Sequence, residues 1–137
     1  MMENSVKPAR SASSFSWSNI ASWVLALLVG ALVGSVTTVI HQSSISVLGI
    51  DIPWGLVASL GTVAAYLLGL RLVRGERVSV IFGALGVLIS VYIFSQRSTG
   101  GSVLVPNNLA GSIWAIAPTL IATIIVAWPK LPERQAK

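Results

Sequence analysis

The sequence predicts an all-α fold: a polytopic membrane protein with four transmembrane helices in a compact bundle and both termini in the cytoplasm. Of its 137 residues, 54% are hydrophobic and 9% are charged, whereas a soluble domain has about 25% charged residues. The apolar residues form four runs of about 17 to 21 residues, close to the roughly 20 that a helix needs to cross a hydrocarbon core. Most of the Lys and Arg residues lie at the ends of the runs that face one side of the predicted membrane. What remains of the chain is too short for a separate soluble domain.

The first predicted helix covers residues 20–40 and follows a polar tail at residues 1–19. The tail contains Lys7, Arg10 and several serines but no apolar periodicity, so we expect a disordered cytoplasmic segment. The apolar run is longer than the 7–15 residues of a signal peptide, and no small-residue cleavage site follows it. We therefore expect a retained transmembrane helix.

The second and third predicted helices cover residues 52–70 and 78–94. A polar connection at residues 42–51 leads to the second helix, which has Pro53 in its first turn, where proline is tolerated best. Residues 71–77 contain three arginines around a glycine and are expected to form a tight turn between the two helices.

The fourth predicted helix covers residues 109–128. It follows the longest connection, residues 95–108, which is rich in turn-forming residues, and it precedes a basic cytoplasmic tail at residues 129–137. Pro118 lies near the middle of this helix, where it removes one hydrogen bond and predicts a kink. Such a kink is either a fixed packing feature or, as in some transporters, a hinge.

The distribution of cations predicts the orientation in the plasma (inner) membrane. Of the nine Lys and Arg residues, only Arg97 falls on the side that carries the connections 42–51 and 95–108. The cations of the other side are Lys7, Arg10, Arg71, Arg74, Arg77, Lys130, Arg134 and Lys137. Because cytoplasmic loops carry an excess of Lys and Arg, this side is expected to be cytoplasmic, with both termini inside.

Several classes of function are excluded by composition. The net charge of +5 is explained by cations beside the apolar runs, so we expect no nucleic-acid binding. The chain has no cysteine, which excludes disulfides and thiolate metal sites. No Asp, Glu, Lys, Arg or His lies inside any apolar run, and acid–base chemistry in a membrane usually depends on such residues. We therefore expect no enzyme, no catalytic residue, no cofactor and no metal.

Two charged residues lie on the outer side, both close to membrane boundaries. Asp51 and Arg97 either form an ion pair that joins the two outer connections or are solvated separately. An exposed pair would contribute only about 0–1 kcal/mol. The single histidine, His41, is expected to be an interfacial residue at the end of the first helix.

Small residues recur at helical spacing and mark faces for close helix packing, which drives helix association in lipid. These residues are Gly30, Gly34, Ala58, Gly61, Ala65, Gly69, Ser79 and Gly83. They either hold the four helices together or bind a partner protein. In the second helix, Val63 and Leu67 lie off this small-residue stripe, so we expect substitutions there to be tolerated better than at Gly61 or Ala65.

An offset of 53 residues aligns Gly30-Ala31-Leu32 with Gly83-Ala84-Leu85 and Pro53 with Pro106. The alignment is consistent with a duplicated two-helix unit or with chance identities in an apolar sequence. A duplication would make the halves parallel.

The whole layout resembles the small uncharacterised four-helix integral membrane proteins of actinobacteria. The shared features are a serine-rich basic N-terminus, the arginine-rich turn at residues 71–77, and an outer connection ending in SVLVPNN before a helix that contains Trp114. The resemblance offers no catalytic residues, and it implies an accessory subunit of a respiratory or cell-envelope complex.

The sequence therefore predicts a non-catalytic accessory, assembly or stabilising subunit of a larger membrane complex. Its expected partners are the lipid bilayer and either a membrane protein or further copies of itself. The alternative is a small transporter or channel for a neutral or lipidic molecule, which would use a kink at Pro118 and a path of hydroxyls. Those hydroxyls belong to Thr37, Thr38, Thr62, Thr119 and Thr123.

Overall fold

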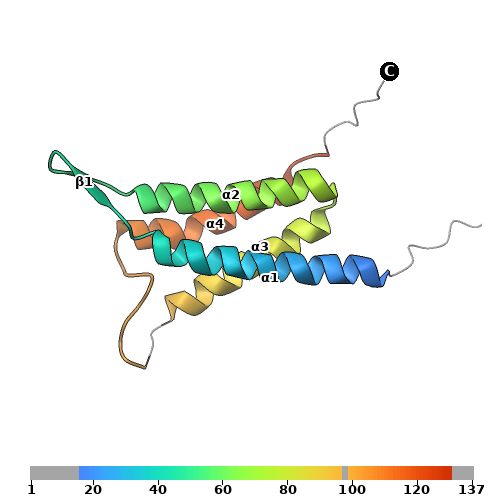
Figure 1. The fold of residues 1–137 in the computed structure, drawn as a ribbon, viewed down its shortest axis with the longest axis horizontal. Helices are drawn as coiled ribbons and strands as arrows, with labels where there is room; N and C mark the ends of the chain where they lie inside the picture. Colours follow the sequence, from blue (N-terminus) through green and yellow to red (C-terminus); the bar gives the residue numbers. More distant parts are fainter. Residues whose placement is uncertain (1–15, 97–98, 131–137) are drawn as a thin grey trace, which may run out of the picture.

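The computed structural model describes residues 16–96 and 99–130, which form a helical bundle with one short β-hairpin (Figure 1). The elements are α1 (Trp17–Ile40), β1 (Ile45–Val47), β2 (Ile50–Ile52), α2 (Trp54–Arg74), α3 (Arg77–Ser95) and α4 (Leu109–Ala127). All 4 helices are long and apolar enough to cross a membrane, with hydropathies between 1.8 and 2.3. The prediction of a bundle of four helices that could span a membrane is confirmed.

The helix ends lie within a few residues of those predicted, and the largest shift is at the turn between α2 and α3. A turn was expected over residues 71–77, but α2 continues to Arg74 and only Gly75 and Glu76 precede α3. Gly75 has a left-handed φ of 64°, and its N–H donates to the Arg71 carbonyl at 3.1 Å. This is a common way for a glycine to end a helix. Arg71 and Arg74 consequently lie in the last turn of α2, where the helix dipole favours cations.

The connection between α1 and α2 also differs from the prediction. Residues 42–51 were expected to be an irregular polar segment, but β1 and β2 pair as an antiparallel hairpin. The alternation of isoleucine and valine with Ser46 and Asp51 suits a strand with one apolar face. Leu48 and Gly49 form the turn, with φ of 53° and 81°, as a tight hairpin turn with two left-handed residues requires.

Helices α1 and α3 make the most extensive contact in the bundle, because glycines let their backbones approach closely. A side-chain carbon at Gly30 would overlap the Gly83 carbonyl, and one at Gly34 would lie 2.8 Å from the Val87 carbonyl oxygen. Gly86, which the sequence analysis did not single out, faces the Leu27 carbonyl in the same way. Glycine is the residue that permits such contact between helices.

Helices α2 and α4 complete the bundle, packing on each other and on the α1–α3 pair. Large side chains from three helices fill the core, and the most completely buried are Val63, Leu67, Val80, Val87 and Trp114. Within α2, the apolar residues of the core are Leu56, Val63 and Leu67.

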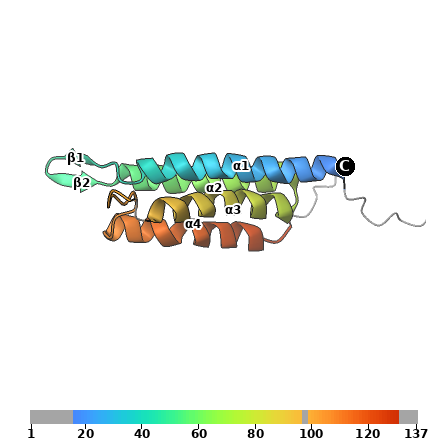
Figure 2. The same cartoon turned by 90° about the horizontal axis from the view of Figure 1, so that it is seen from below.

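The two ends of the bundle are different. The start of α1, the α2–α3 turn and the end of α4 lie at one end, which we call the basic end because it carries Arg71, Arg74, Arg77 and Lys130 (Figures 1 and 2). The other end carries the hairpin, which projects beyond the helices (Figure 2), and we call it the hairpin end. These four are the described members of the eight cations that the sequence assigns to one side; the other four lie outside the described residues.

Candidate functional site

The small residues of α1 and α3 lie where the two helices meet. Gly30 and Gly34 of α1 and Ser79 and Gly83 of α3 are all buried. A side-chain carbon at Gly83 would also lie 3.2 Å from the Tyr66 hydroxyl oxygen of α2. These four positions are therefore occupied by contacts within the chain.

The small residues of α2 lie elsewhere, and here the expectation of packing within the bundle is wrong. Ala58, Gly61 and Ala65 are exposed, and a side-chain carbon at Gly61 or Gly69 would meet nothing within 4 Å. We call these four residues the outer α2 face. Val63 and Leu67, expected to be tolerant positions, are 0% exposed. Val63 and Leu67 fill the space between the helices at this level of α2, and the stripe of four small residues therefore faces outward.

The candidate outer ion pair of Asp51 with Arg97 lies in part outside the described residues, because Arg97 is not among them. Asp51 accepts a hydrogen bond from the Ser46 hydroxyl across the hairpin. This contact holds the polar face of the hairpin together.

His41, expected at the membrane interface at the end of the first helix, is fully buried within the bundle at the hairpin end. It follows α1 directly, is 0% exposed, and stacks on Trp114 of α4 with ring centroids 5.2 Å apart. The Trp114 indole N–H donates to Thr38 Oγ1 at 3.2 Å, and the Thr38 hydroxyl donates to the Gly34 carbonyl at 2.6 Å. The sequence could not indicate this pairing, because the two rings lie far apart along the chain.

Polar side chains of the hairpin end complete the surroundings of His41. Its Nδ1 lies against the Thr38 carbonyl, which can only accept, so Nδ1 carries the proton and Nε2 accepts from Gln42 Nε2 at 2.7 Å. Burial lowers the pKa of His41, opposed in part by the Thr38 carbonyl. Asn108 donates to Gln42 Oε1 at 3.3 Å and caps α4 by accepting from the Gly111 N–H at 2.7 Å. The cluster joins α1 to the start of α4 around a neutral imidazole.

This arrangement suits a structural role for His41. Among the described residues, no group of three or more His, Asp and Glu side chains could hold a metal ion. The imidazole is stacked on Trp114 and hydrogen-bonded at both nitrogens, which leaves neither nitrogen available to a substrate. The sequence prediction of no metal site and no catalytic residue stays a prediction, and the cluster provides no reason to change it.

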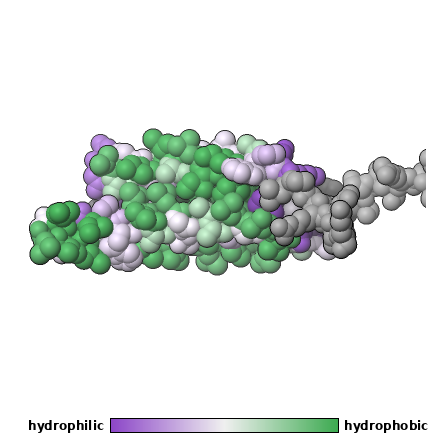
Figure 3. All heavy atoms as spheres, turned by 90° about the horizontal axis from the view of Figure 1, so that it is seen from above, coloured by the Kyte–Doolittle hydropathy of each residue, from purple (hydrophilic) through white to green (hydrophobic). Residues whose placement is uncertain are grey.

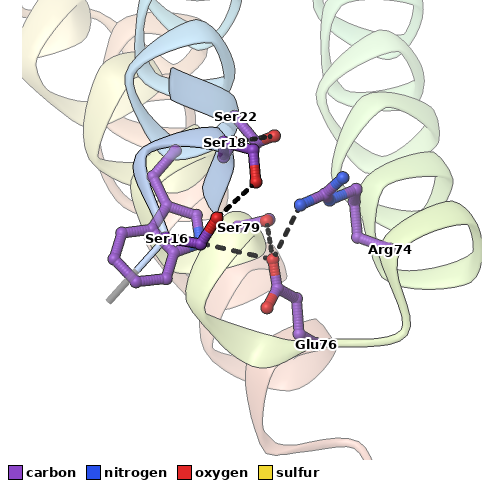
Figure 4. A network of polar contacts seen from close by, with 7 residues as sticks. Ser16, Ser18, Ser22, Arg74, Glu76 and Ser79 are labelled. Carbon is purple, nitrogen blue, oxygen red and sulfur yellow. Dashed lines mark hydrogen bonds and ion pairs between the residues drawn. The ribbon is translucent and has the colours of Figure 1, made fainter. Parts of the chain in front are cut away.

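A second polar cluster lies at the basic end around Glu76 (Figure 4). One Glu76 carboxylate oxygen accepts from Ser79 Oγ at 2.6 Å, Trp23 Nε1 at 3.2 Å and Arg74 Nη2 at 3.3 Å. The hydrogen bond from Ser79 is the main reason that the pKa of Glu76 is lowered. Trp23 also stacks on Phe82, with centroids 5.8 Å apart. The cluster ties α1 to the α2–α3 turn.

The features proposed for a transport path are not brought together. Thr37 and Thr38 are buried, and their hydroxyls donate to carbonyls of their own helix. The other hydroxyls, those of Thr62, Thr119 and Thr123, are exposed on the outside of the bundle. Pro118 is fully buried within α4, which continues through it from Leu109 to Ala127.

The hairpin presents a group of exposed apolar side chains at the hairpin end. In its register Ile45 pairs with Ile52 and Val47 with Ile50, so these four side chains share one face and Ser46 and Asp51 lie on the other. The four apolar residues are all exposed, Ile50 at 68%. The space-filling view shows this projecting part as hydrophobic (Figure 3). We call the four residues together with Leu48 the apolar hairpin surface.

Leu48 stands out within this surface for two reasons. It is 99% exposed at the tip, and it is the only described residue other than glycine with a positive φ. A left-handed conformation costs an ordinary residue about 1–2 kcal/mol, and a turn of this kind favours Asn-Gly or Asp-Gly. Neither solvation nor backbone geometry accounts for leucine here. Contiguous exposed apolar surface and local backbone strain are both typical of binding sites.

Comparison with known proteins found no matching protein family, no similar curated protein and no similar solved structure.

Proposed function

We propose that this chain is a non-catalytic accessory, assembly or stabilising subunit of a larger membrane complex, of the respiratory or cell-envelope kind. The observation that carries the proposal is Leu48, a fully exposed leucine held in a left-handed conformation at the tip of an apolar hairpin. In the complex, an apolar pocket of the partner covers Leu48 and the neighbouring isoleucines.

Burial of this surface supplies a driving force for association. Full burial of one leucine side chain stabilises a complex by about 1.5–3 kcal/mol, and Ile45, Val47, Ile50 and Ile52 extend the same surface. The hairpin needs little ordering on binding, since its strands are already paired. A preformed loop loses less entropy on association than a flexible one does.

The outer α2 face gives the partner a second point of contact. Ala58, Gly61 and Ala65 expose small side chains along α2, and in lipid a face of this type lets the backbone of another helix approach closely. The proposed partner is therefore a helical membrane protein that contacts α2 within the bilayer and the hairpin outside it.

The proposed location is the plasma (inner) membrane, with both termini in the cytoplasm. The basic end carries Arg71, Arg74, Arg77 and Lys130, and such cation-rich connections remain on the cytoplasmic side. The hairpin then projects on the outer side. The partner's pocket is accordingly expected on its outer surface.

The experiment is purification of the full chain from native membranes in a mild detergent, followed by quantitative mass spectrometry of co-purifying proteins. The wild type is expected to retain a stoichiometric membrane-protein partner, and Leu48→Asn is expected to reduce its yield about tenfold or more, as loss of a buried leucine implies. Leu104→Asn is the control, because Leu104 is a half-exposed leucine of the connection between α3 and α4. An unchanged partner yield with Leu48→Asn would overturn docking through the hairpin.

The alternative function is a small transporter or channel for a neutral or lipidic molecule. The observation that favours it is an apolar groove of about 790 Å³ between α2 and α4. A homo-oligomer that purifies without any other protein, from both the wild type and Leu48→Asn, would support this alternative over the accessory subunit.

A further inference from the structure

The groove between α2 and α4 has apolar walls and cations at one end. Its walls include Ala64 and Leu68 of α2 and Ile121 and Ile125 of α4, and Arg71 and Lys130 lie toward the basic end. None of the described residues that line it is acidic. We call it the basic groove. Its chemistry suits a ligand with an apolar body and a negative head.

Arg71 is only partly satisfied by the protein. One guanidinium nitrogen, Nη2, donates to the Trp128 carbonyl at 2.9 Å. The other, Nη1, is buried and has no hydrogen-bond partner within the described structure. A buried charged donor without a partner is costly. The nearby carboxylate of Glu76 already accepts from Arg74, Ser79 and Trp23.

The depth of the groove matches one leaflet of a bilayer. Along α2 and the Gly75 that ends it, the lining extends from Ala64 to Gly75, which at 1.5 Å per residue is about 16 Å. Half of a hydrocarbon core is about 15 Å. With the basic end at the cytoplasmic interface, Arg71 and Lys130 lie at the level of lipid headgroups, and Trp128 lies where tryptophan is favoured.

We propose that the basic groove binds an anionic phospholipid of the cytoplasmic leaflet. The lipid phosphate accepts hydrogen bonds from the Arg71 guanidinium, including Nη1, and interacts with the Lys130 ammonium. An acyl chain lies along Ala64, Leu68 and Ile121. The proposal rests on the proposed membrane orientation but not on a protein partner, and it assigns the groove a tightly held lipid rather than a transported one.

The first test compares phosphatidylglycerol with phosphatidylcholine of the same acyl chains, titrated into the purified full chain and followed by native mass spectrometry. The wild type is expected to bind phosphatidylglycerol about 25-fold more tightly, since Arg71 and Lys130 each contribute about fivefold near a lipid surface. Arg71→Gln and Lys130→Gln should each lose about fivefold. Arg77→Gln is the matched control, because Arg77 lies at the same end but does not line the groove.

Equal binding of the two lipids by the wild type would overturn the proposal. An equal loss in Arg77→Gln and Arg71→Gln would overturn it too, because it would indicate general attraction to the basic end. Inorganic phosphate, titrated as a competitor, is expected to leave lipid binding unchanged at millimolar concentration. Full displacement by phosphate would identify a site for the free anion and would contradict the lipid assignment.

A pair of adjacent alanines tests the apolar part of the groove without changing charge. Ala64 lines the groove, whereas Ala65 belongs to the outer α2 face. Ala64→Phe is expected to reduce phosphatidylglycerol binding at least fivefold, and Ala65→Phe is expected to leave it unchanged. Unchanged binding with Ala64→Phe would overturn the proposal even where Arg71→Gln failed to fold. Partner docking is measured at Leu48, at the opposite end, so failure of either proposal leaves the other open to its own test.

Discussion

Gly30 of α1 and Gly83 of α3 meet backbone to backbone where the two helices cross, and a side-chain carbon at Gly30 would overlap the Gly83 carbonyl. The contact is reinforced by hydrogen bonds between the same helices, from the Ser90 hydroxyl to the Ala31 carbonyl at 2.8 Å. It also explains why α1 and α3 form the closest pair in the bundle.

The first prediction compares two identical substitutions. Gly30→Ala should lower the free energy of unfolding by about 1–3 kcal/mol, since the added methyl forces the crossing apart. Gly61→Ala should leave stability unchanged or raise it by up to about 1 kcal/mol, because alanine favours helix and the position is open. Both effects are measured by thermal unfolding of the purified protein in detergent. Equal destabilisation by the two variants would contradict the packing described for α1 and α3.

The second prediction is the opposite of the sequence-based expectation that Val63 and Leu67 tolerate substitution better than Gly61 and Ala65. Leu67→Ala should destabilise the bundle by about 2–5 kcal/mol, because it removes a fully buried side chain and leaves a cavity. Ala65→Leu should not change the unfolding midpoint of the isolated protein, since Ala65 faces outward. If Ala65→Leu destabilised the protein and Leu67→Ala did not, the small residues of α2 would have to lie inside the bundle.

The position of the helices could be predicted from the sequence because the length of an apolar run is a local property. Which face of α2 turns inward could not, since α2 has small residues at helical spacing on one face and Val63 and Leu67 at helical spacing on another. The choice depends on the shapes that α1, α3 and α4 present. The burial of His41 is likewise set by Trp114, a contact between distant parts of the chain.

The hairpin was missed although its signal is local. Ile45 to Ile52 alternate in polarity on either side of a two-residue turn, but the turn is Leu-Gly rather than the Asn-Gly that usually marks such hairpins. One structural observation bears on the possible duplication at an offset of 53 residues. Gly30 and Gly83 are aligned by this offset, and they are also in contact in the bundle. Equivalent residues meet in this way when two parallel halves pack around a two-fold axis.

The third prediction concerns pH. Burial lowers the pKa of His41 from 6.5, so the unfolded chain binds the proton more readily than the folded one does. The contribution of His41 to the free energy of unfolding is therefore fully present above about pH 6.5 and is lost as the pH falls below that value. The thermal midpoint should therefore decrease between pH 7.5 and 5.5. His41→Gln should abolish this slope, while Glu76, whose lowered pKa acts below 4.5, remains ionised throughout. If the thermal midpoint of His41→Gln still decreased between pH 7.5 and 5.5, the pH dependence would arise from a group other than His41.

The fourth prediction concerns orientation and uses the absence of native cysteine. A single cysteine at Ser44→Cys should react with a membrane-impermeant maleimide in intact cells, because Ser44 is exposed beside the hairpin but outside the apolar hairpin surface, and the hairpin end is proposed to lie outside. Arg77→Cys, at the basic end, should react only after the membrane is permeabilised. The opposite labelling pattern would invert the topology and would place the hairpin in the cytoplasm.

The last prediction separates stability from binding at the hairpin tip. Leu48 has a φ of 53° and Gly49 a φ of 81°, so Leu48→Asn replaces leucine by a residue that tolerates the left-handed conformation and completes an Asn-Gly turn. The isolated protein should become more stable by roughly 1 kcal/mol as backbone strain is relieved, although the same variant should lose the partner. Gly49→Ala, the control, should instead destabilise the hairpin, because it introduces strain where none exists.

Hydrogen exchange of the amides of β1 and β2 reports this local stability directly, with slower exchange expected in Leu48→Asn and faster exchange in Gly49→Ala. If Leu48→Asn is more stable than the wild type but binds the partner less well, the leucine at position 48 serves a contact with another molecule. If Leu48→Asn instead destabilised the isolated hairpin, the leucine would be serving the fold, and the argument for a docking surface would lose its main support.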